Sequence, residues 1–412
     1  MRAQPGGDRS RRDGGSEAFL VCEPIAGGHE HVPFNAGFLR IIRTAYPGHR
    51  IVFCAEAEHS THVRDQLGSS LASTFEWIII TLPRRNAGFF RRLPSDFHRI
   101  RVLLNLVKED PSLLVCTLTS ANASVLWSVK ALIRTFHRDA RLQIVLHGDF
   151  SKLRFRASLK QHLNPIYHLG SFRTAIRWAC DKSVQHIVLE ESVRRIVVEK
   201  FPVLRDRFRT LELPLPGDWD GSAPRPLVTP IRFGFLGRGY EAKGFSSFLE
   251  VARTTSTRFP GLAEFHMIGS MDSKQQSRHA KELAFLASPP ETQLLSRARF
   301  LERLESMHFV CMFYDESYEF TASAGLLDCV EWAKPILGSR RTLFANLEVA
   351  FGEIGYLCDD SQRAQVVESI LANLDVDRYL RQVQSMLAIK ASRSPQLLAL
   401  RQSELVEELL RK

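Results

Sequence analysis

The chain has 412 residues, of which 44% are hydrophobic and 24% are charged, a composition typical of a globular protein with room for two domains. Its apolar runs are far shorter than the roughly 20 residues that a membrane-spanning helix needs, so we expect no such helix. The net charge of +10 suggests a phosphorylated ligand, a nucleic acid or an anionic membrane surface as a partner.

Residues 1–16 are basic and glycine-rich and lack the apolar stretch of a signal peptide, so we expect a disordered arm. The seven cysteines are scattered and none forms a CxxC pair. This spacing indicates buried, reduced thiols in a cytoplasmic protein, and neither a zinc site nor disulfides.

The segment 17–215 alternates short apolar strands with amphipathic helices, which is typical of a parallel sheet covered on both faces. Such sheets bind ligands at the carboxyl ends of their strands. Gly27 and Gly28 follow the first expected strand, and His147, Gly148 and Asp149 close a later one. The expected strands are 18–22, 51–54, 77–82, 113–118, 142–147, 185–189 and 211–213, with helices at 38–42, 99–108 and 125–136.

A stretch rich in proline and glycine, 216–230, predicts a linker to a second domain, 231–390, which repeats the alternation. The segment 391–412 predicts a C-terminal helix that packs back on the first domain. In the second domain we expect strands at 231–236, 265–268, 308–313, 336–337 and 356–358, and helices at 244–257, 275–286, 297–306, 324–333 and 361–374.

The strand 231–236 ends at Gly237, and the turn that follows carries Arg238 and Lys243 before the next helix. A strand that leads into a helix through a glycine turn brings backbone N–H groups and the positive end of the helix dipole together. An arginine fork and a lysine charge added there indicate a diphosphate site. The alternative is a pair of solvated surface charges.

A second informative stretch follows the strand 308–313. The chain passes Tyr314 and reaches a helix start of small residues, Ser323, Ala324 and Gly325, which let a ligand approach bare N–H groups. Asp328 lies one turn further, where its carboxylate can accept two hydrogen bonds from ribose hydroxyls.

In this order the motifs resemble those of the retaining glycosyltransferases of the GT-B fold, family 4. The matching residues are Gly237-Arg238 with Lys243-Gly244, Asp328 with Lys334-Pro335-Ile336-Leu337, His147-Gly148, and Gly27-Gly28. The resemblance implies an α/β protein with two Rossmann-like β/α/β domains that face each other across a cleft. It covers roughly residues 18–340 and is strongest in the second half.

The resemblance also implies roles. Arg238 and Lys243 would hold the diphosphate of a nucleotide sugar, and Asp328 its ribose. The N–H groups of Ser323 to Gly325 would contact the distal phosphate, the Gly27-Gly28 loop would close over it, and His147 would lie at the reaction centre. Two protein cations would replace a metal ion, so no metal or cofactor is expected, and the acceptor would attack from the leaving-group face without a carboxylate nucleophile.

One position departs from the family. Its two glutamates separated by seven residues correspond here to Phe320 and Asp328. Glu319, beside Phe320, would have to serve in its place, or Tyr314 and the backbone would hold the sugar. The nucleotide base would be read in the 288–297 region, which offers no diagnostic side chain.

We therefore predict transfer of a hexose from a nucleoside-diphosphate sugar to a saccharide or lipid-linked saccharide hydroxyl, in bacterial surface polysaccharide or glycolipid synthesis. The alternatives are a nucleotide-sugar epimerase and a catalytically degenerate binding protein. The missing acid at Phe320 favours the degenerate protein, and intact Arg238, Lys243 and Asp328 oppose it.

Three other sequence patterns could suggest metal or membrane binding and also have simpler interpretations. Asp218-Trp219-Asp220 imitates a metal-binding DxD but stands in the linker, and the loop His29-Glu30-His31 lacks further ligands, so no metal is expected at either. The basic and aromatic segments 84–101 and 151–178 are either solvated helix faces or a patch that binds anionic lipid at the inner face of the cytoplasmic membrane. No nucleic-acid motif accompanies the charge.

Overall fold

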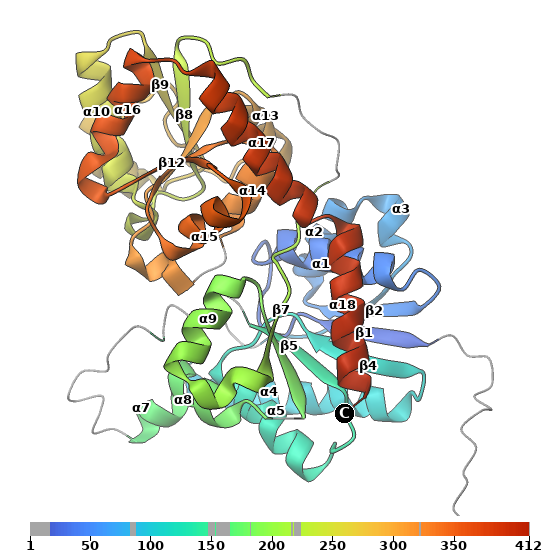
Figure 1. The fold of residues 1–412 in the computed structure, drawn as a ribbon. Helices are drawn as coiled ribbons and strands as arrows, with labels where there is room; N and C mark the ends of the chain where they lie inside the picture. The colour runs from blue at the N-terminus through green and yellow to red at the C-terminus, as the bar shows by residue number, and fades with distance from the viewer. Residues whose placement is uncertain are drawn as a thin grey trace, which may run out of the picture. The chain divides into compact units, whose positions relative to one another are not determined.

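The computed structural model describes residues 17–82, 88–146, 153, 165–181, 183–215, 217, 224–320 and 323–411, with side chains at 165–167 and 319–320 left out. Its contacts divide the chain into two compact units, and its strands form two sheets (Figure 1). The first unit comprises residues 1–146, 159–187 and 399–412, and the second comprises 147–158 and 188–398.

The first sheet has seven strands in the order β3-β2-β1-β4-β5-β6-β7. The pairs β1–β2, β1–β4, β2–β3 and β4–β5 are all parallel. The strands are β1 (Ala18–Cys22), β2 (Arg50–Ala55), β3 (Glu76–Ile79), β4 (Leu113–Leu118), β5 (Leu142–Leu146), β6 (Val184–Val188) and β7 (Phe208–Thr210). Every residue of β1 is buried, as expected of a central strand with helices on both faces.

The helices that accompany this sheet pack in groups. α1 packs on α2, and α5 packs on both α4 and α8. They are α1 (Val32–Ala45), α2 (Ala57–Leu67), α3 (Ser69–Ala72), α4 (Phe89–Glu109), α5 (Ala123–Thr135), α7 (Pro165–Gly170), α8 (Phe172–Ala179), α9 (Glu191–Lys200) and the 3₁₀ turn η2 (Pro202–Arg207).

The last helix, α18 (Pro395–Leu410), drawn in red in Figure 1, joins the first sheet through buried amides. The Gln402 amide donates to Oε1 of Gln143 in β5 at 2.8 Å, and the Gln185 amide in β6 donates to the carbonyl of Leu405 at 3.0 Å. These bonds offset part of the cost of burying three polar side chains between helix and sheet, although Oε1 of Gln402 has no partner among the described residues.

The second sheet has five strands in the order β12-β11-β10-β8-β9, and all neighbouring pairs are parallel. Phe233 stacks between Phe265 and Phe309, with ring centroids 5.2 and 5.6 Å apart, and forms the centre of one face. The strands are β8 (Ile231–Leu236), β9 (Ala263–Ile268), β10 (Phe309–Met312), β11 (Ile336–Ser339) and β12 (Gly355–Cys358).

Helices also alternate with these strands. They are α10 (Phe245–Arg258), α11 (Ser273–Arg278), α12 (Ala280–Leu283), α13 (Arg297–Glu305), α14 (Ala324–Glu331), α15 (Thr342–Phe351), α16 (Arg363–Ala372) and α17 (Val376–Ser392), with 3₁₀ turns η3 (Glu241–Lys243), η4 (Glu316–Phe320) and η5 (Asp360–Gln362). Within the described residues, no helix combines the length and apolar character needed to cross a membrane.

The predicted fold class, α/β with two parallel sheets, is confirmed. The predicted burial of all seven cysteines is also confirmed, and all are free thiols. The strand predicted at 211–213 is wrong, because β7 is 208–210, although the amides of Leu211 and Leu213 still bond the carbonyls of Val188 and Leu189. The helix predicted at 275–286 is broken at His279 into α11 and α12.

Candidate functional site

The second sheet changes direction between β8 and β10. From β8 the chain moves to β9 on one side, and β10 then pairs with the other side of β8. Open α/β sheets bind ligands at the carboxyl ends of the strands where this reversal occurs. Residues that follow β8 and β10 therefore belong to one candidate site.

The turn after β8 carries both predicted cations. Gly237 has a φ of +87°, a backbone conformation that side chains rarely adopt, and it turns the chain out of the strand. Arg238 is exposed, and its Nη1 donates to the Tyr240 hydroxyl at 3.0 Å. Lys243 folds back over the strand end, with its Nζ 3.5 Å from the Leu236 carbonyl oxygen.

Gly244 packs this turn against the end of β10. Its φ is +78°, and a Cβ built there would collide with the carbonyl oxygen of Phe313. The amide of Asp315 also donates to the carbonyl of Ala242 at 3.0 Å. The glycine of the Lys243-Gly244 pair is thus required because two backbones come very close at the strand ends.

The small residues at the start of α14 pack around a buried tyrosine. The hydroxyls of Tyr314 and Ser323 are 2.7 Å apart, and Ser323 Oγ also accepts from the Leu326 amide at 3.1 Å. A Cβ on Gly325 would lie 3.2 Å from the Tyr314 hydroxyl. Burial raises the pKa of Tyr314 well above its usual range, so the phenol keeps its proton.

Lys243 and Asp328 act on each other electrostatically. Burial lowers the pKa of Lys243, the charge of Asp328 opposes that shift, and Arg238 adds to it. Burial raises the pKa of the Asp328 carboxyl, and Arg297 and Lys243 oppose the shift. The site therefore joins a partly desolvated lysine and carboxylate with the exposed Arg238, and charged groups perturbed in this way often mark ligand sites.

Arg297 was missed in the sequence. Its Nη1 lies 2.7 Å from Asp328 Oδ1, and its Nη2 lies 3.6 Å from Glu331. It is the last residue of the segment 288–297, where the sequence offered no diagnostic side chain. Its pairing with Asp328 depends on how α13 lies beside α14, which the sequence does not reveal.

Several predicted residues cannot be placed. His147, Gly148, Asp149 and Asp218-Trp219-Asp220 lie outside the described residues, and so do the side chains of Glu319 and Phe320. The structure thus gathers Arg238, Lys243, Tyr314, Ser323 to Gly325 and Asp328 at one sheet edge. Gly27 and Gly28 belong to the first unit and are described there.

The first sheet reverses direction between β1 and β4, and a buried carboxylate occupies the strand ends there. Glu23 accepts hydrogen bonds from the Ala26 amide at 2.9 Å and the Thr119 hydroxyl at 3.1 Å. Further contacts come from Ile25, His31, Asn35 and Ser120. Burial alone would raise the pKa of Glu23, but bonds from His31, Ser120 and Ala26 together with the charge of His31 hold it well below the usual range.

The predicted Gly27-Gly28 loop is attached to α2. The Gly28 amide donates to Glu56 Oε2 at 3.3 Å, and His59 Nδ1 lies 2.9 Å from the Gly28 carbonyl oxygen. Asn35 donates to His59 Nε2 at 2.9 Å, so Nδ1 carries the proton that bonds Gly28. Burial lowers the pKa of His59 and favours this neutral form.

The basic segment 84–101 divides into two parts. Arg99 is buried and pairs with buried Asp96 at 2.7 Å, and its other nitrogen donates to the Pro24 carbonyl. The interpretation of this whole segment as a solvated or interfacial face is therefore wrong at Arg99, because α4 uses this arginine to hold the chain that follows β1. Exposed Phe90 and Arg91 still fit that interpretation.

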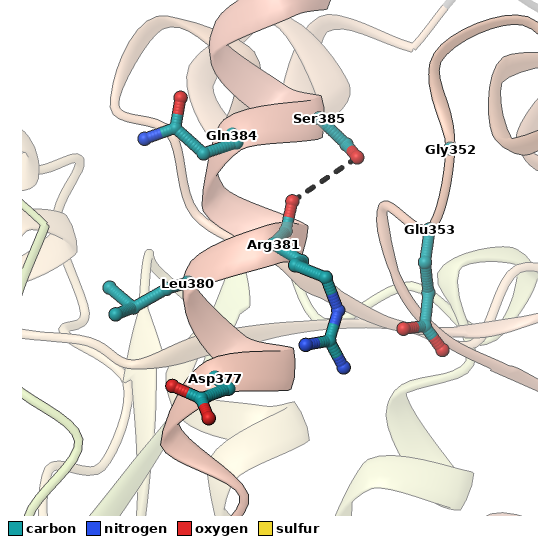
Figure 2. Close-up of a pocket in the computed structure, with 7 residues that line it drawn as sticks. All are labelled: Gly352, Glu353, Asp377, Leu380, Arg381, Gln384 and Ser385. Carbon is teal, nitrogen blue, oxygen red and sulfur yellow. Dashed lines mark hydrogen bonds between the residues drawn. The ribbon is translucent and has the colours of Figure 1, made fainter.

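A pocket with a volume of ≈ 590 Å³ is lined by none of these residues, and Figure 2 shows the residues that line it. Gly352 and Glu353 precede β12, so the pocket lies at the amino ends of the strands of the second sheet, whereas Arg238 and Lys243 follow the carboxyl end of β8. Its side chains come from Glu353 and from α17, namely Asp377, Leu380, Arg381, Gln384 and Ser385. It is not the predicted diphosphate site.

No protein-family model matches the chain, and neither does any curated protein. Solved structures do match along nearly its whole length. A glycosyltransferase from Rickettsia africae aligns with a TM-score of 0.64 and 12% identity, over 96% of this chain and 99% of the other. Anabaena HepE in complex with UDP aligns with a TM-score of 0.63 and 12% identity, over 95% and 100%.

The N-terminal domain of a trehalose-6-phosphate phosphatase from Candida albicans aligns as well, with a TM-score of 0.63 and 11% identity over 98% of both chains. At this identity the similarity concerns the fold. The chain has the two-sheet α/β fold of GT-B glycosyltransferase structures. The chemistry has to be argued from the residues themselves.

Proposed function

We propose that the protein is a glycosyltransferase that moves a hexose from a nucleoside-diphosphate sugar to a hydroxyl acceptor with retention of anomeric configuration. The observation that carries this proposal is the half-buried Lys243, held at the β8/β10 strand ends beside Arg238 and under the electrostatic influence of Asp328. A structure of similar fold, Anabaena HepE, was determined with UDP, which makes UDP the first nucleotide to test.

In the proposed reaction the bond between the sugar and the diphosphate breaks, and negative charge develops on the leaving phosphate oxygens. Lys243 and Arg238 are already in place to stabilise that charge, which lowers the barrier because no reorganisation is needed. Lys243 sits in a desolvated position, where its charge acts more strongly than in water. Asp328 would accept hydrogen bonds from the ribose hydroxyls and hold the nucleotide in position.

The remaining parts of the proposal concern the loops. The N–H groups of Ser323 to Gly325 would bind the distal phosphate, and the Gly27-Gly28 loop would close over it. His147 would lie near the sugar and the reaction centre, with Glu319 in place of the missing family glutamate. Metal-independent transfer follows if the two cations suffice.

A second candidate is a nucleotide-binding protein without transferase activity. Arg297 already holds the Asp328 carboxylate at 2.7 Å, and this pairing competes with a ribose for the same oxygens. Together with Phe320 in place of an acid, it favours binding over turnover. The two candidates differ in whether a glycoside is formed.

We also propose that the acceptor is presented at an anionic lipid surface. Large apolar side chains are exposed on α4, α7 and α8, with Phe90 at 48%, Leu169 at 44% and Trp178 at 56% exposure. Arg177 lies over the Trp178 ring at 5.1 Å, and exposed Arg91 and Arg173 add positive charge. Aromatic rings combined with arginines suit the interface of an anionic bilayer.

The first experiment is a thermal-shift screen of the whole protein against UDP, GDP, ADP and dTDP, with and without magnesium. A ligand that binds only the native state raises the unfolding midpoint by mass action, because at a hundredfold excess over Kd it adds about 2.7 kcal/mol to the free energy of unfolding. The corresponding nucleotide sugars are then offered with saccharide and lipid-linked acceptors, and NMR reads the anomeric configuration of the product.

A midpoint shift by one nucleotide without magnesium, followed by formation of a glycoside with the anomeric configuration of the donor, supports the proposal. A hit without a glycoside product favours the binding protein, and a new free nucleotide sugar without acceptor favours an epimerase. If no nucleotide shifts the midpoint, the diphosphate assignment is wrong. Flotation with vesicles that contain anionic lipid tests the membrane surface, and binding that does not respond to salt or to Trp178→Ala would refute it.

A further inference from the structure

A group of metal-ligand side chains lies on the first unit, where the loop after β1 meets α2. It consists of His29 from the loop and Glu58 and His62 from the helix, with one potential ligand atom from each within 4.8 Å of the others. From the sequence, His29 was set aside because no further ligands accompanied its loop. The tertiary structure supplies two of them from residues about 30 positions away along the chain.

The spacing of the two helical residues suits a metal. Glu58 and His62 are four residues apart in α2, so they occupy the same face of the helix one turn apart. Nε2 of His62 lies 3.6 Å from Glu58 Oε1. This buried nitrogen finds no hydrogen-bond partner among the described residues, so it remains available as a ligand.

His29 approaches this face of α2 from the loop that follows β1. Its ring stacks on that of His62, with the centroids 3.7 Å apart. Gly28, whose φ is +57°, comes so close to the helix that a Cβ built on it would lie 3.6 Å from the Glu58 carboxylate. The three side chains therefore converge on one point of the surface.

The backbone on both sides of the group is fixed. Glu56 begins α2 by accepting from the His59 amide at 2.9 Å and also binds the Gly28 amide, while the His59 ring holds the Gly28 carbonyl. Loop and helix are thus already attached to each other beside His29. Because the scaffold is preorganised, binding an ion requires only small rotations of the exposed His29 and Glu58 and the half-buried His62.

We propose that His29, Glu58 and His62 form a zinc-binding site. Two imidazoles and one carboxylate are a ligand set typical of Zn²⁺, with bonds of about 2.0–2.2 Å that place ligand atoms at most about 4 Å apart. Water completes the tetrahedron. The ion links the loop that follows β1, which also carries Gly27 and Gly28, to α2.

Magnesium is not the expected ion. It prefers oxygen ligands in octahedral geometry, whereas two of the three ligands here are nitrogens. The cysteines do not compete in the folded protein, since all seven are buried. Zinc that the folded protein binds is therefore held by histidines and carboxylates.

The test is calorimetric titration of chelator-treated, full-length protein with ZnCl₂. We expect one equivalent to bind. We expect His29→Ala and His62→Ala each to weaken binding by about a hundredfold, and Glu58→Gln by about tenfold or more, since even indirect ligand partners are worth 10–100-fold. Because binding is restricted to the folded state, zinc should also raise the unfolding midpoint.

The matched control is His98→Ala, which removes an exposed histidine from α4 of the same unit and should leave zinc binding unchanged. The ligand variants alter exposed or half-buried side chains, and an unchanged unfolding midpoint without zinc verifies their fold. Equal zinc affinity in the wild type and in a His29→Ala/His62→Ala double variant overturns the proposal, and so does a wild type that binds magnesium as well as zinc.

Discussion

The two sheets reverse strand order in the same way, between β1 and β4 in one and between β8 and β10 in the other, yet opposite charges stand at the two reversals. After β1 the buried Glu23 is surrounded by hydrogen-bond donors, and its charge is satisfied within the protein. After β8, the charge at the reversal is the half-buried Lys243. Its Nζ has a 3.5 Å contact with the Leu236 carbonyl and the electrostatic influence of Asp328.

This difference shows how one topology serves two purposes. A charge with a full set of partners holds loops together and has little left to offer a ligand. A desolvated cation with few partners gains most when an anion arrives. We therefore expect Glu23 to contribute to stability and Lys243 to binding, and each of the following experiments tests that contrast.

The largest expected effect is on stability, from Glu23→Ala. The substitution leaves six donors around a buried site without their acceptor, and removal of one partner from a buried charged network typically costs about 3–5 kcal/mol. Urea unfolding should show that loss, while Glu109→Ala, at an exposed position at the end of α4, should change stability by less than about 0.5 kcal/mol. An unaltered midpoint in Glu23→Ala would show that the network is dispensable.

Lys243→Ala should affect binding and turnover instead. Removal of a preplaced group that stabilises developing charge typically costs about 10²–10³ in rate, and we expect transfer and nucleoside-diphosphate affinity both to fall by at least about a hundredfold. The unfolding midpoint without ligand should stay close to that of the wild type. The control is Lys281→Ala, an exposed lysine of α12. Normal turnover in Lys243→Ala would refute the diphosphate assignment.

A third experiment tests the amino ends of the strands of the second sheet, where we expect the buried groups to contribute to stability and to bind no ligand. Buried His308 accepts from the Arg232 amide and donates to the Pro226 carbonyl, both at 2.9 Å, and burial lowers its pKa to about 4. The unfolded chain binds this proton near pH 6.5, so stability is full above that pH and falls as the pH drops toward 4, by about 3 kcal/mol in total.

Urea unfolding at several pH values measures this effect as a difference. The stability gap between the wild type and His308→Gln should shrink by about 3 kcal/mol between pH 7 and pH 4. A gap to His308→Gln that does not depend on pH would mean that His308 does not resist protonation in the fold.

The smallest effect concerns the protonation of Lys243. Because burial lowers its pKa below the usual 10.5, the cation is lost earlier than from a free lysine as the pH rises. Affinity for the bound nucleoside diphosphate should fall by about tenfold per pH unit above that pKa. Lys243→Arg should move the fall to higher pH, because a guanidinium stays charged. Calorimetry from pH 7.5 up to the usual lysine value of 10.5 measures the fall in affinity for both proteins, and identical profiles would mean that another group titrates.

Much of the second unit followed from local sequence. The continuous apolar run of β8, the glycine that ends it and the helix after Gly244 are neighbours along the chain, so periodicity and turn chemistry predicted them. In the first unit, the bounds of the strands at 18–22 and 113–118 were predicted to the residue for the same reason. The strand expected at 211–213 failed because pairing with β6, and not apolar character, decides where β7 lies.

Only the tertiary structure determined which partners the charged side chains have. Arg297 meets Asp328, Arg99 is buried against Asp96, and Glu58 and His62 come beside His29 because helices and loops distant in sequence pack together. A sequence shows that a side chain is charged and roughly where it lies along an element. Whether that charge is neutralised, buried or left for a ligand depends on the side chains opposite it, and these are selected by packing between elements.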